Sequence, residues 1–180
     1  MKTLCIFCGS RPGVDPTYVE TARWVGTSIA QRGVAIVYGG GRVGLMGAVA
    51  DAALAANGRV IGVIPQMLVD REVGHAGISE LHVVRTMAER KEMMGALSDG
   101  FLTLPGGTGT MDELFEAWTW TQLGLQRKPS GLLNLRGYYD PLIAFLDRAV
   151  DQGFLSALNR DQLWVDDSAE RLIERLCAFS

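Results

Sequence analysis

Residues 101–116 constrain this chain more than any other stretch, because they read as a buried strand, a tight turn and the start of a helix. The strand, residues 101–104, is short and apolar, and Pro105 ends it because proline has no N–H for the sheet ladder. Glycines at positions 106, 107 and 109 allow positive φ and a close approach of the backbone to a ligand. The stretch therefore predicts a strand–turn–helix unit within an α/β protein.

The helix after this turn is expected to begin with Thr110 as its cap and to carry Asp112 and Glu113 in its first turn. A glycine turn that leads into a helix N-terminus presents free N–H groups to an anion such as phosphate. A glycine turn needed only for packing is the alternative. The two carboxylates favour the ligand-binding interpretation over the packing one. Carboxylates repel a phosphate, so their place beside a phosphate site makes sense if they act on another part of the same ligand.

Length and charge narrow the class of protein. The length of 180 residues predicts one domain, 1–180, and 48% hydrophobic residues can form a full core. A net charge of −3 gives no reason to expect nucleic acid or an anionic membrane as a partner. The first residues read as a strand and not as a signal peptide, so we expect a cytoplasmic protein.

The cysteines and histidines indicate neither a disulfide nor a metal site. Cys5 and Cys8 are three residues apart on a predicted strand, so their side chains point to opposite faces, and two buried thiols are expected. His75 and His82 lack metal-ligand spacing with each other or with any cysteine.

Strand and helix patterns alternate along the whole chain. Apolar runs that end at glycine or proline predict a parallel sheet covered by helices on both faces, a Rossmann-like α/β fold. Ligands of such sheets bind beyond the carboxyl ends of the strands. The strands are expected at 4–8, 34–38, 60–64, 81–84, 101–104, 132–134 and 163–165, the helices at 16–32, 44–56, 87–97, 110–123, 139–152 and up to 179, and a loop at 66–79.

A second glycine turn, residues 39–47, contains the pattern G-x-G-x-x-G after a strand. The acid that would hold a dinucleotide ribose is missing at the end of the next strand, which reads Ile64-Pro65-Gln66. The turn therefore indicates a smaller nucleotide and not NAD.

The helix before the organising turn begins with a capping box from Thr86 to Glu89. Arg90 and Lys91 follow in the middle of its apolar stripe. Charges on an inward face must be paired or must serve a ligand, so a structural salt bridge and a ligand role both remain open.

Trp118 and Trp120 fall on different sides of the helix that follows the organising turn. A sheet covers only one side of a helix, so this placement predicts a partner subunit over the other side, with a buried core tryptophan as the alternative for each.

Three stretches together resemble the Lonely Guy family of cytokinin riboside 5′-monophosphate phosphoribohydrolases. They are Gly39-Gly40-Gly41-x-x-Gly44-Leu45-Met46-Gly47, Met87-x-x-Arg90-Lys91 and Pro105-Gly106-Gly107-x-Gly109-Thr110-x-x-Glu113. The resemblance implies a homodimer with sites near the interface, no cofactor, and hydrolysis of the N-glycosidic bond of an adenosine-type 5′-monophosphate. Related proteins have carried a lysine decarboxylase label, but nothing in this sequence supports pyridoxal phosphate chemistry.

Carried over residue by residue, the resemblance implies Arg90 and Glu113 as the catalytic pair. It places substrate contacts on Glu72, Lys91, Gly107, Thr108, Gly109, Thr110, Met111, Asp112 and Glu113. The other glycine turns add Gly9, Ser10, Gly40 and Gly41, and Arg90 is expected to contact the substrate as well.

These residues suit cleavage through an oxocarbenium-like state, in which a carboxylate stabilises positive charge or polarises the attacking water. Candidates for protonating the leaving base are Asp112, Glu116 and Glu72, without a ranking. A carrier protein of the same fold that binds a nucleotide or cofactor without turnover is the alternative function.

Overall fold

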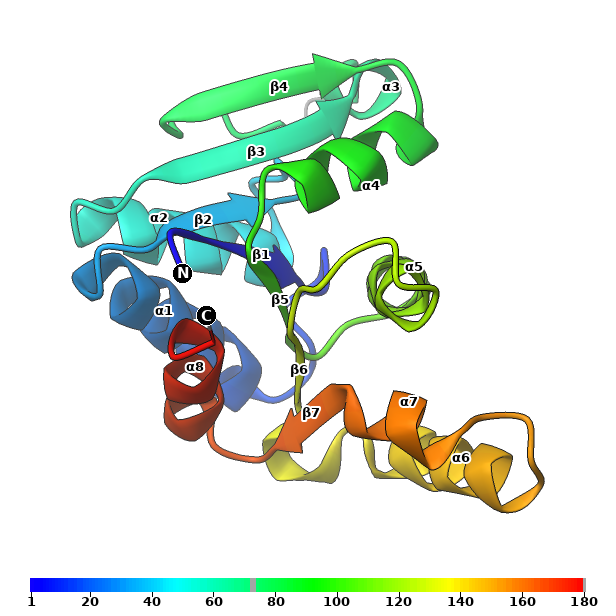
Figure 1. Cartoon of the computed structure of the whole chain (residues 1–180). Coiled ribbons are helices and arrows are strands. Elements are labelled where there is room, and N and C mark those ends of the chain that lie inside the picture. Colours follow the sequence, from blue (N-terminus) through cyan, green and yellow to red (C-terminus); the bar gives the residue numbers. More distant parts are fainter. Residues whose placement is uncertain (72–73, 180) are drawn as a thin grey trace.

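The computed structural model describes residues 1–71 and 74–179, and its strands and helices alternate in sequence (Figure 1). The strands are β1 (Thr3–Phe7), β2 (Ala35–Tyr38), β3 (Val60–Pro65), β4 (Glu80–Val84), β5 (Gly100–Thr103), β6 (Ser130–Leu133) and β7 (Leu163–Asp166). The helices are α1 (Pro16–Gln31), α2 (Gly44–Ala55), α3 (Gln66–Val69), α4 (Met87–Ala96), α5 (Thr108–Gln122), the 3₁₀ helix η1 (Leu135–Gly137), α6 (Asp140–Asp151), α7 (Ala157–Asp161) and α8 (Ala169–Cys177).

The strands form one 7-stranded sheet in the order β4-β3-β2-β1-β5-β6-β7. Every neighbouring pair is parallel, with Cys5 opposite Val37 on one side and Phe101 on the other. All residues of β2, β3, β5 and β6 are buried, which explains their continuous apolar sequences. The predicted Rossmann-like parallel sheet is confirmed.

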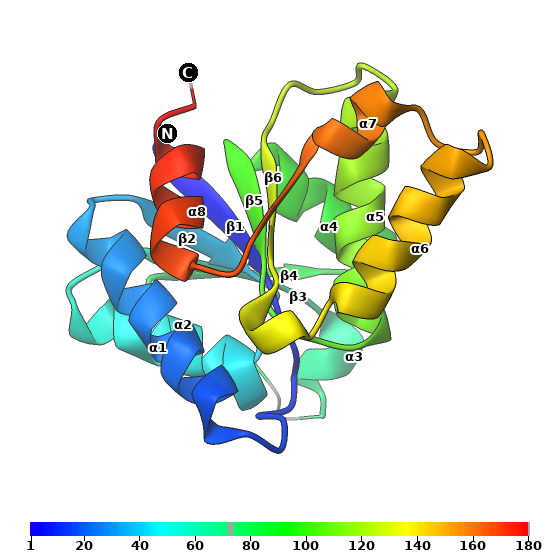
Figure 2. The same cartoon turned by 90° about the horizontal axis from the view of Figure 1, so that it is seen from below.

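Helices cover both faces of this sheet. Figures 1 and 2 show α1, α2 and α8 on one face and α4, α5 and α6 on the other. The larger core lies under α1, α2 and α8 and includes Ile29, Val49 and Leu172, while Met94 of α4 and Leu114 of α5 belong to the cores of the opposite face. Cys5 and Cys8 are both buried, as expected. Within the described residues, no helix is long and apolar enough to span a bilayer.

The strand order reverses between β1 and β5, and the candidate site lies at this switch point. The chain leaves β1 for α1 on one face and leaves β5 for α5 on the other face (Figure 1). The two connections diverge and leave a crevice at the carboxyl edge, the usual place for a ligand in an open α/β sheet. Two of the three glycine turns, those after β1 and β5, meet there.

The start of α5 differs from the prediction. The helix begins at Thr108 with Gly107 as its N-cap, and no side chain caps it. Thr110 lies inside the first turn and is buried, so Asp112 and Glu113 fall in the second turn. Glycine at the N-cap leaves the first N–H groups of the helix without a side-chain acceptor.

Three short helices were absent from the predicted elements. Helix α3 lies within residues 66–79, which were expected to form a loop, η1 lies between β6 and α6, and α7 lies between α6 and β7. All three are too short for a 3.6-residue period to be visible in the sequence.

The predicted capping box of α4 is confirmed on one side only. Thr86 is the N-cap, and its hydroxyl accepts a hydrogen bond from the N–H of Glu89 at 3.1 Å. The carboxylate of Glu89 accepts from the N–H of Arg85 at 2.9 Å instead of from Thr86.

Candidate active site

The turn between β5 and α5 opens on a cleft of about 440 Å³. Among the described residues, no heavy atom beyond the adjoining residues and the backbone of α5 itself lies within 4 Å of a Cβ placed on Gly107 or Gly109, so packing does not require glycine there. The free space leaves room for a ligand in front of the N–H groups that begin α5. The cleft is lined by Gly9, Ser10, Arg11, Pro12, Gly13, Tyr18, Leu45, Pro105, Gly106, Gly107, Thr108, Gly109 and Tyr138.

The three glycine turns are joined by backbone hydrogen bonds. The N–H of Gly9 donates to Pro105 O at 3.1 Å, and the N–H of Leu45 donates to Gly9 O at 3.0 Å. A Cβ on Gly106 would overlap the Thr110 hydroxyl and lie 2.9 Å from Gly9 N. Glycine at position 106 is therefore required by the close approach of two turns, in contrast to Gly107 and Gly109.

A second cavity of about 280 Å³ adjoins the cleft and shares Ser10 and Arg11 with it. Its wall is largely apolar, and the cationic groups on it are Arg11 and Arg90. Within the described part of the chain, no carboxylate lines either cavity. The cations and the start of α5 together suit an anionic ligand with an apolar part. The other residues that line the second cavity are Gly39, Gly41, Val43, Met46, Ile64 and Leu68.

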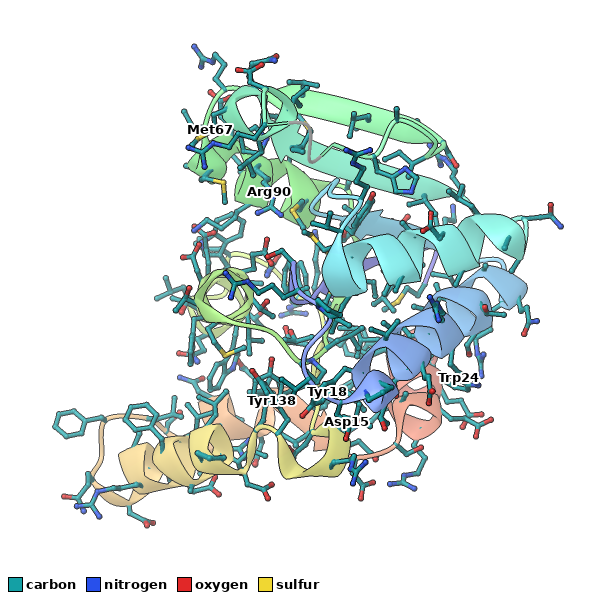
Figure 3. All side chains as sticks on the ribbon, turned by 180° about the vertical axis from the view of Figure 1, so that it is seen from behind. Asp15, Tyr18, Trp24, Met67, Arg90 and Tyr138 are labelled. Atoms are coloured by element: carbon teal, nitrogen blue, oxygen red, sulfur yellow. The ribbon has the colours of Figure 1, made fainter. Side chains whose placement is uncertain are left out.

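Arg90 reaches the second cavity from α4 and is only 7% exposed (Figure 3). Its Nη1 lies 2.8 Å from Oε1 of Glu113, which is also 7% exposed. Its Nε donates to the carbonyl of Val63 at 3.1 Å. A buried guanidinium with a carboxylate and a carbonyl as partners is held in one orientation.

Glu113 lies behind Arg90 and is not among the described residues that line either cavity. Burial raises the pKa of Glu113, and the charge of Arg90 opposes that rise. The pair therefore has the features of a functional site: two buried charges of opposite sign and one perturbed carboxyl. In this arrangement Arg90 is the member of the pair that faces the ligand space.

Gly39, at the end of β2, makes room for Arg90, because a Cβ there would overlap the Nη2 atom. We expect Gly39→Ala to displace the guanidinium from Glu113 and to lower turnover by about tenfold or more, the cost of a misaligned charged hydrogen bond. Steady-state kinetics on the folded variant measures this loss. The control is Gly33→Ala, whose Cβ has no described heavy atom within 4 Å, and its effect should be confined to stability because φ is +70°.

The structure does not bring all the predicted contact residues into the cavities. Lys91 joins α4 to α5, with Nζ 2.9 Å from Asp112 and 3.0 Å from Glu116. Of the two roles left open by the sequence, Lys91 therefore has the structural salt bridge. Arg90 has both an ion pair and access to a cavity. The predicted contacts that line neither cavity are Gly40, Lys91, Thr110, Met111, Asp112 and Glu113, and Glu72 lies outside the described residues.

Arg11, Tyr18 and Tyr138 line the cleft although the sequence had not singled them out. Figure 3 shows Tyr18 and Tyr138 next to each other, and their rings meet edge to face with centroids 5.8 Å apart. Arg11 directly follows the predicted Gly9 and Ser10, so its position was a usable signal. The two tyrosines come from distant segments and carry no local pattern.

Fold and site together define a Rossmann-like protein with an uncapped glycine turn at the switch point of its sheet and a buried arginine–glutamate pair beside it. A family model described as "Possible lysine decarboxylase" matches residues 46–176. Cytokinin riboside 5′-monophosphate phosphoribohydrolase LOG7 of Arabidopsis thaliana is 45% identical over 175 residues, which are 97% of this chain and 81% of that protein. The chain belongs to this family, the Lonely Guy proteins, as the sequence motifs indicated.

Two further comparisons agree. The probable cytokinin riboside 5′-monophosphate phosphoribohydrolase LOGL1 of Oryza sativa subsp. japonica is 43% identical, over 96% of this chain and 78% of that protein. The solved structure of the molybdenum cofactor binding protein from the phototrophic bacterium Rippkaea orientalis is 25% identical, with a TM-score of 0.73 over 99% of this chain and 97% of that chain. Sequence and backbone therefore point to the same fold.

Proposed function

We propose that this protein hydrolyses the N-glycosidic bond of an adenosine-type 5′-monophosphate, with or without an N6 substituent, and releases the free base and ribose 5-phosphate. The observation that carries the proposal is the Arg90–Glu113 pair, which lies next to a glycine turn suited to phosphate. Relatives 43–45% identical over nearly the whole chain are named for this activity.

The phosphate is assigned to the N–H groups of residues 107–109 at the start of α5. The ribose and base then extend toward the second cavity, where Val43, Met46 and Leu68 offer an apolar wall and Arg90 a cation. The shared residues Ser10 and Arg11 lie between the two subsites. This placement brings the anomeric carbon to the second cavity, which Arg90 lines.

In the reaction, the bond between base and ribose breaks, water supplies hydroxide to the anomeric carbon, and its proton goes to the base. Positive charge develops on the ribose, and the carboxylate of Glu113 stabilises it or polarises the water. Arg90 orients Glu113, because the two side chains are directly paired. The guanidinium, which lines the cavity in front of Glu113, has to shift toward the anionic nucleotide for the carboxylate to act on the ribose. Asp112 and Glu116 are paired with Lys91 and line neither cavity, which makes both poor donors to the leaving base.

The test is to incubate the protein with AMP and with N6-isopentenyl-AMP and to separate the products by chromatography. We expect free base and ribose 5-phosphate in equal amounts, with Arg90→Ala as the inactive control. Recovery of intact nucleotide after incubation with stoichiometric folded protein would contradict the proposal.

A nucleotide or cofactor carrier is the second candidate, favoured by the similarity to the solved molybdenum cofactor binding protein, which is 25% identical. A carrier would bind the nucleotide and return it unchanged, so the same experiment separates the two functions. The buried Arg90–Glu113 pair favours the hydrolase, because binding alone gives no reason to bury a carboxylate beside an anion site.

The chain is further proposed to form one nucleotide-binding domain over residues 1–180 and to act in the cytoplasm. The three cysteines are free thiols, which suits a reducing compartment.

A homodimer is proposed as well, although the two tryptophans support it less than expected. Trp118 is buried and donates from Nε1 to Asn159 O at 3.0 Å. Trp120 is half-buried and packs against Gly95 of α4 in its own chain. Better support comes from Met67, Val83 and Met87, which are large, apolar and exposed on neighbouring elements near the Arg90 end of α4.

We expect light scattering coupled to size exclusion to give twice the chain mass of 19.5 kDa at micromolar concentration. Met67→Glu should shift the mass toward the monomer and lower activity if the partner closes the cavity at Arg90, because a charge is costly in an apolar interface. Phe145→Glu on the outer face of α6 is the control for an added charge. A fully active monomer would contradict the shared-site arrangement.

A further inference from the structure

The connection between β6 and α6 places two consecutive tyrosines against the turn that leads into α5. The hydroxyl of Tyr138 donates to Gly106 O at 2.7 Å, and the hydroxyl of Tyr139 donates to Leu104 O at 2.8 Å. The carbonyl between them, Pro105 O, accepts from the N–H of Gly9 at 3.1 Å. All three carbonyls of this turn therefore have a donor from another segment of the chain.

These bonds also determine where the N–H groups of the turn point. In a trans peptide the C=O and the N–H point in opposite directions, so a held carbonyl fixes the following N–H. Tyr138 therefore fixes the N–H of Gly107, which belongs to the start of α5. This peptide joins two glycines, which allow more backbone conformations than any other residues, so its orientation depends on an outside contact.

The segment that carries Tyr138 is itself held against the start of α1. Arg136, two residues earlier, has φ of 53°, a left-handed conformation that is rare for a residue with a side chain. Its Nη1 lies 3.0 Å from Oδ2 of Asp15, whose Oδ1 accepts from Thr17 N and caps α1. Figure 3 shows Asp15, Tyr18 and Tyr138 grouped at this corner of the molecule. Strained backbone held by such contacts is found most often at functional sites.

We propose that Tyr138 is a positioning residue of the phosphate subsite. Its phenol locks the peptide between Gly106 and Gly107 so that the N–H of Gly107 stays available to the phosphate of the bound nucleotide. The inference rests on the proposed function in placing the phosphate at residues 107–109, but not on hydrolysis itself.

The chain offers a matched control. Tyr139 makes the same kind of bond, but the carbonyl that it holds belongs to the peptide between Leu104 and Pro105, which has no N–H. Tyr138→Phe and Tyr139→Phe thus each remove one phenol–carbonyl bond from the same turn. Only the first change frees a donor of the phosphate subsite.

Titration calorimetry with AMP and with adenosine is the test, because it needs no turnover if Glu113→Gln is the background. We expect Tyr138→Phe to weaken AMP binding about tenfold, the value of one hydrogen bond to a charged group, and to leave adenosine binding unchanged. Tyr139→Phe should lower the melting temperature and keep the AMP affinity. In the active protein, the same Tyr138→Phe change should raise KM more than it lowers kcat.

Two results would overturn the assignment. One is AMP affinity in Tyr138→Phe within twofold of the parent protein, and the other is an equal loss for AMP and adenosine, which would indicate general damage to the site. A protein that binds AMP with this dependence on Tyr138 but releases no base would refute the proposed hydrolysis and leave the role of Tyr138 standing.

Discussion

Replacement of Glu113 by glutamine is expected to lower turnover by on the order of 10²- to 10⁴-fold while AMP binding is retained. Glutamine keeps the shape of the side chain and can still accept a hydrogen bond from Arg90, 2.8 Å away in the parent protein. The negative charge that would stabilise the oxocarbenium-like state is lost. Single-turnover rates of base release, with calorimetric AMP binding beside them, measure the two effects separately.

Stability must be followed in the same variant, because removal of one charge leaves the buried guanidinium of Arg90 without its counter-ion. Asp147→Asn is a suitable control. Asp147 of α6 pairs with Arg160 of α7 at 2.8 Å, and neither residue lines the two cavities of the site, so the change removes a carboxylate from an arginine elsewhere in the protein. Its turnover should be that of the parent protein. A folded Glu113→Gln variant with near-normal turnover would remove Glu113 from the mechanism.

Much of the fold could be predicted from the sequence, because buried parallel strands carry apolar side chains on both faces and end at glycine or proline. The run Val60–Ile64 before Pro65 is an example, and β3 ends at that proline. The start of α5 was misplaced by two residues, because Thr110 looks like a cap in the sequence. Its side chain is instead buried against Gly106 in the structure.

The site was only partly predictable. The glycine turns, the inward-facing Arg90 and the carboxylate of Glu113 could be noticed because their residue types are unusual for their positions, but only the resemblance to the Lonely Guy family joined Arg90 and Glu113 as a pair. That Arg90 lies between Glu113 and the cavity could not be predicted, because it depends on the space that Gly39 leaves just after β2. Likewise, Arg136 and Asp15 are 121 positions apart, and only the folded chain pairs them beside Tyr138, which lines the cleft.

The second large effect concerns the substrate: AMP should be hydrolysed and adenosine should hardly react. The first N–H groups of α5 face an open space, with Arg11 at the same cleft. Two or three charged hydrogen bonds to the phosphate would be lost with adenosine, which corresponds to a fall in kcat/KM on the order of 10³-fold or more. Initial rates of base release for the two compounds, over the same range of concentrations, test this.

How the loss divides between kcat and KM shows what the phosphate subsite contributes. Binding energy from a group remote from the reacting bond can be used to hold the ribose in the reactive position, and its removal then lowers kcat as well as raising KM. We expect both changes, because the phosphate is assigned to the first N–H groups of α5 and Glu113 lies in the next turn of the same helix. A loss confined to KM would mean that the turn only supplies affinity. Comparable kcat/KM for AMP and adenosine would place the phosphate elsewhere and contradict the assignment of residues 107–109.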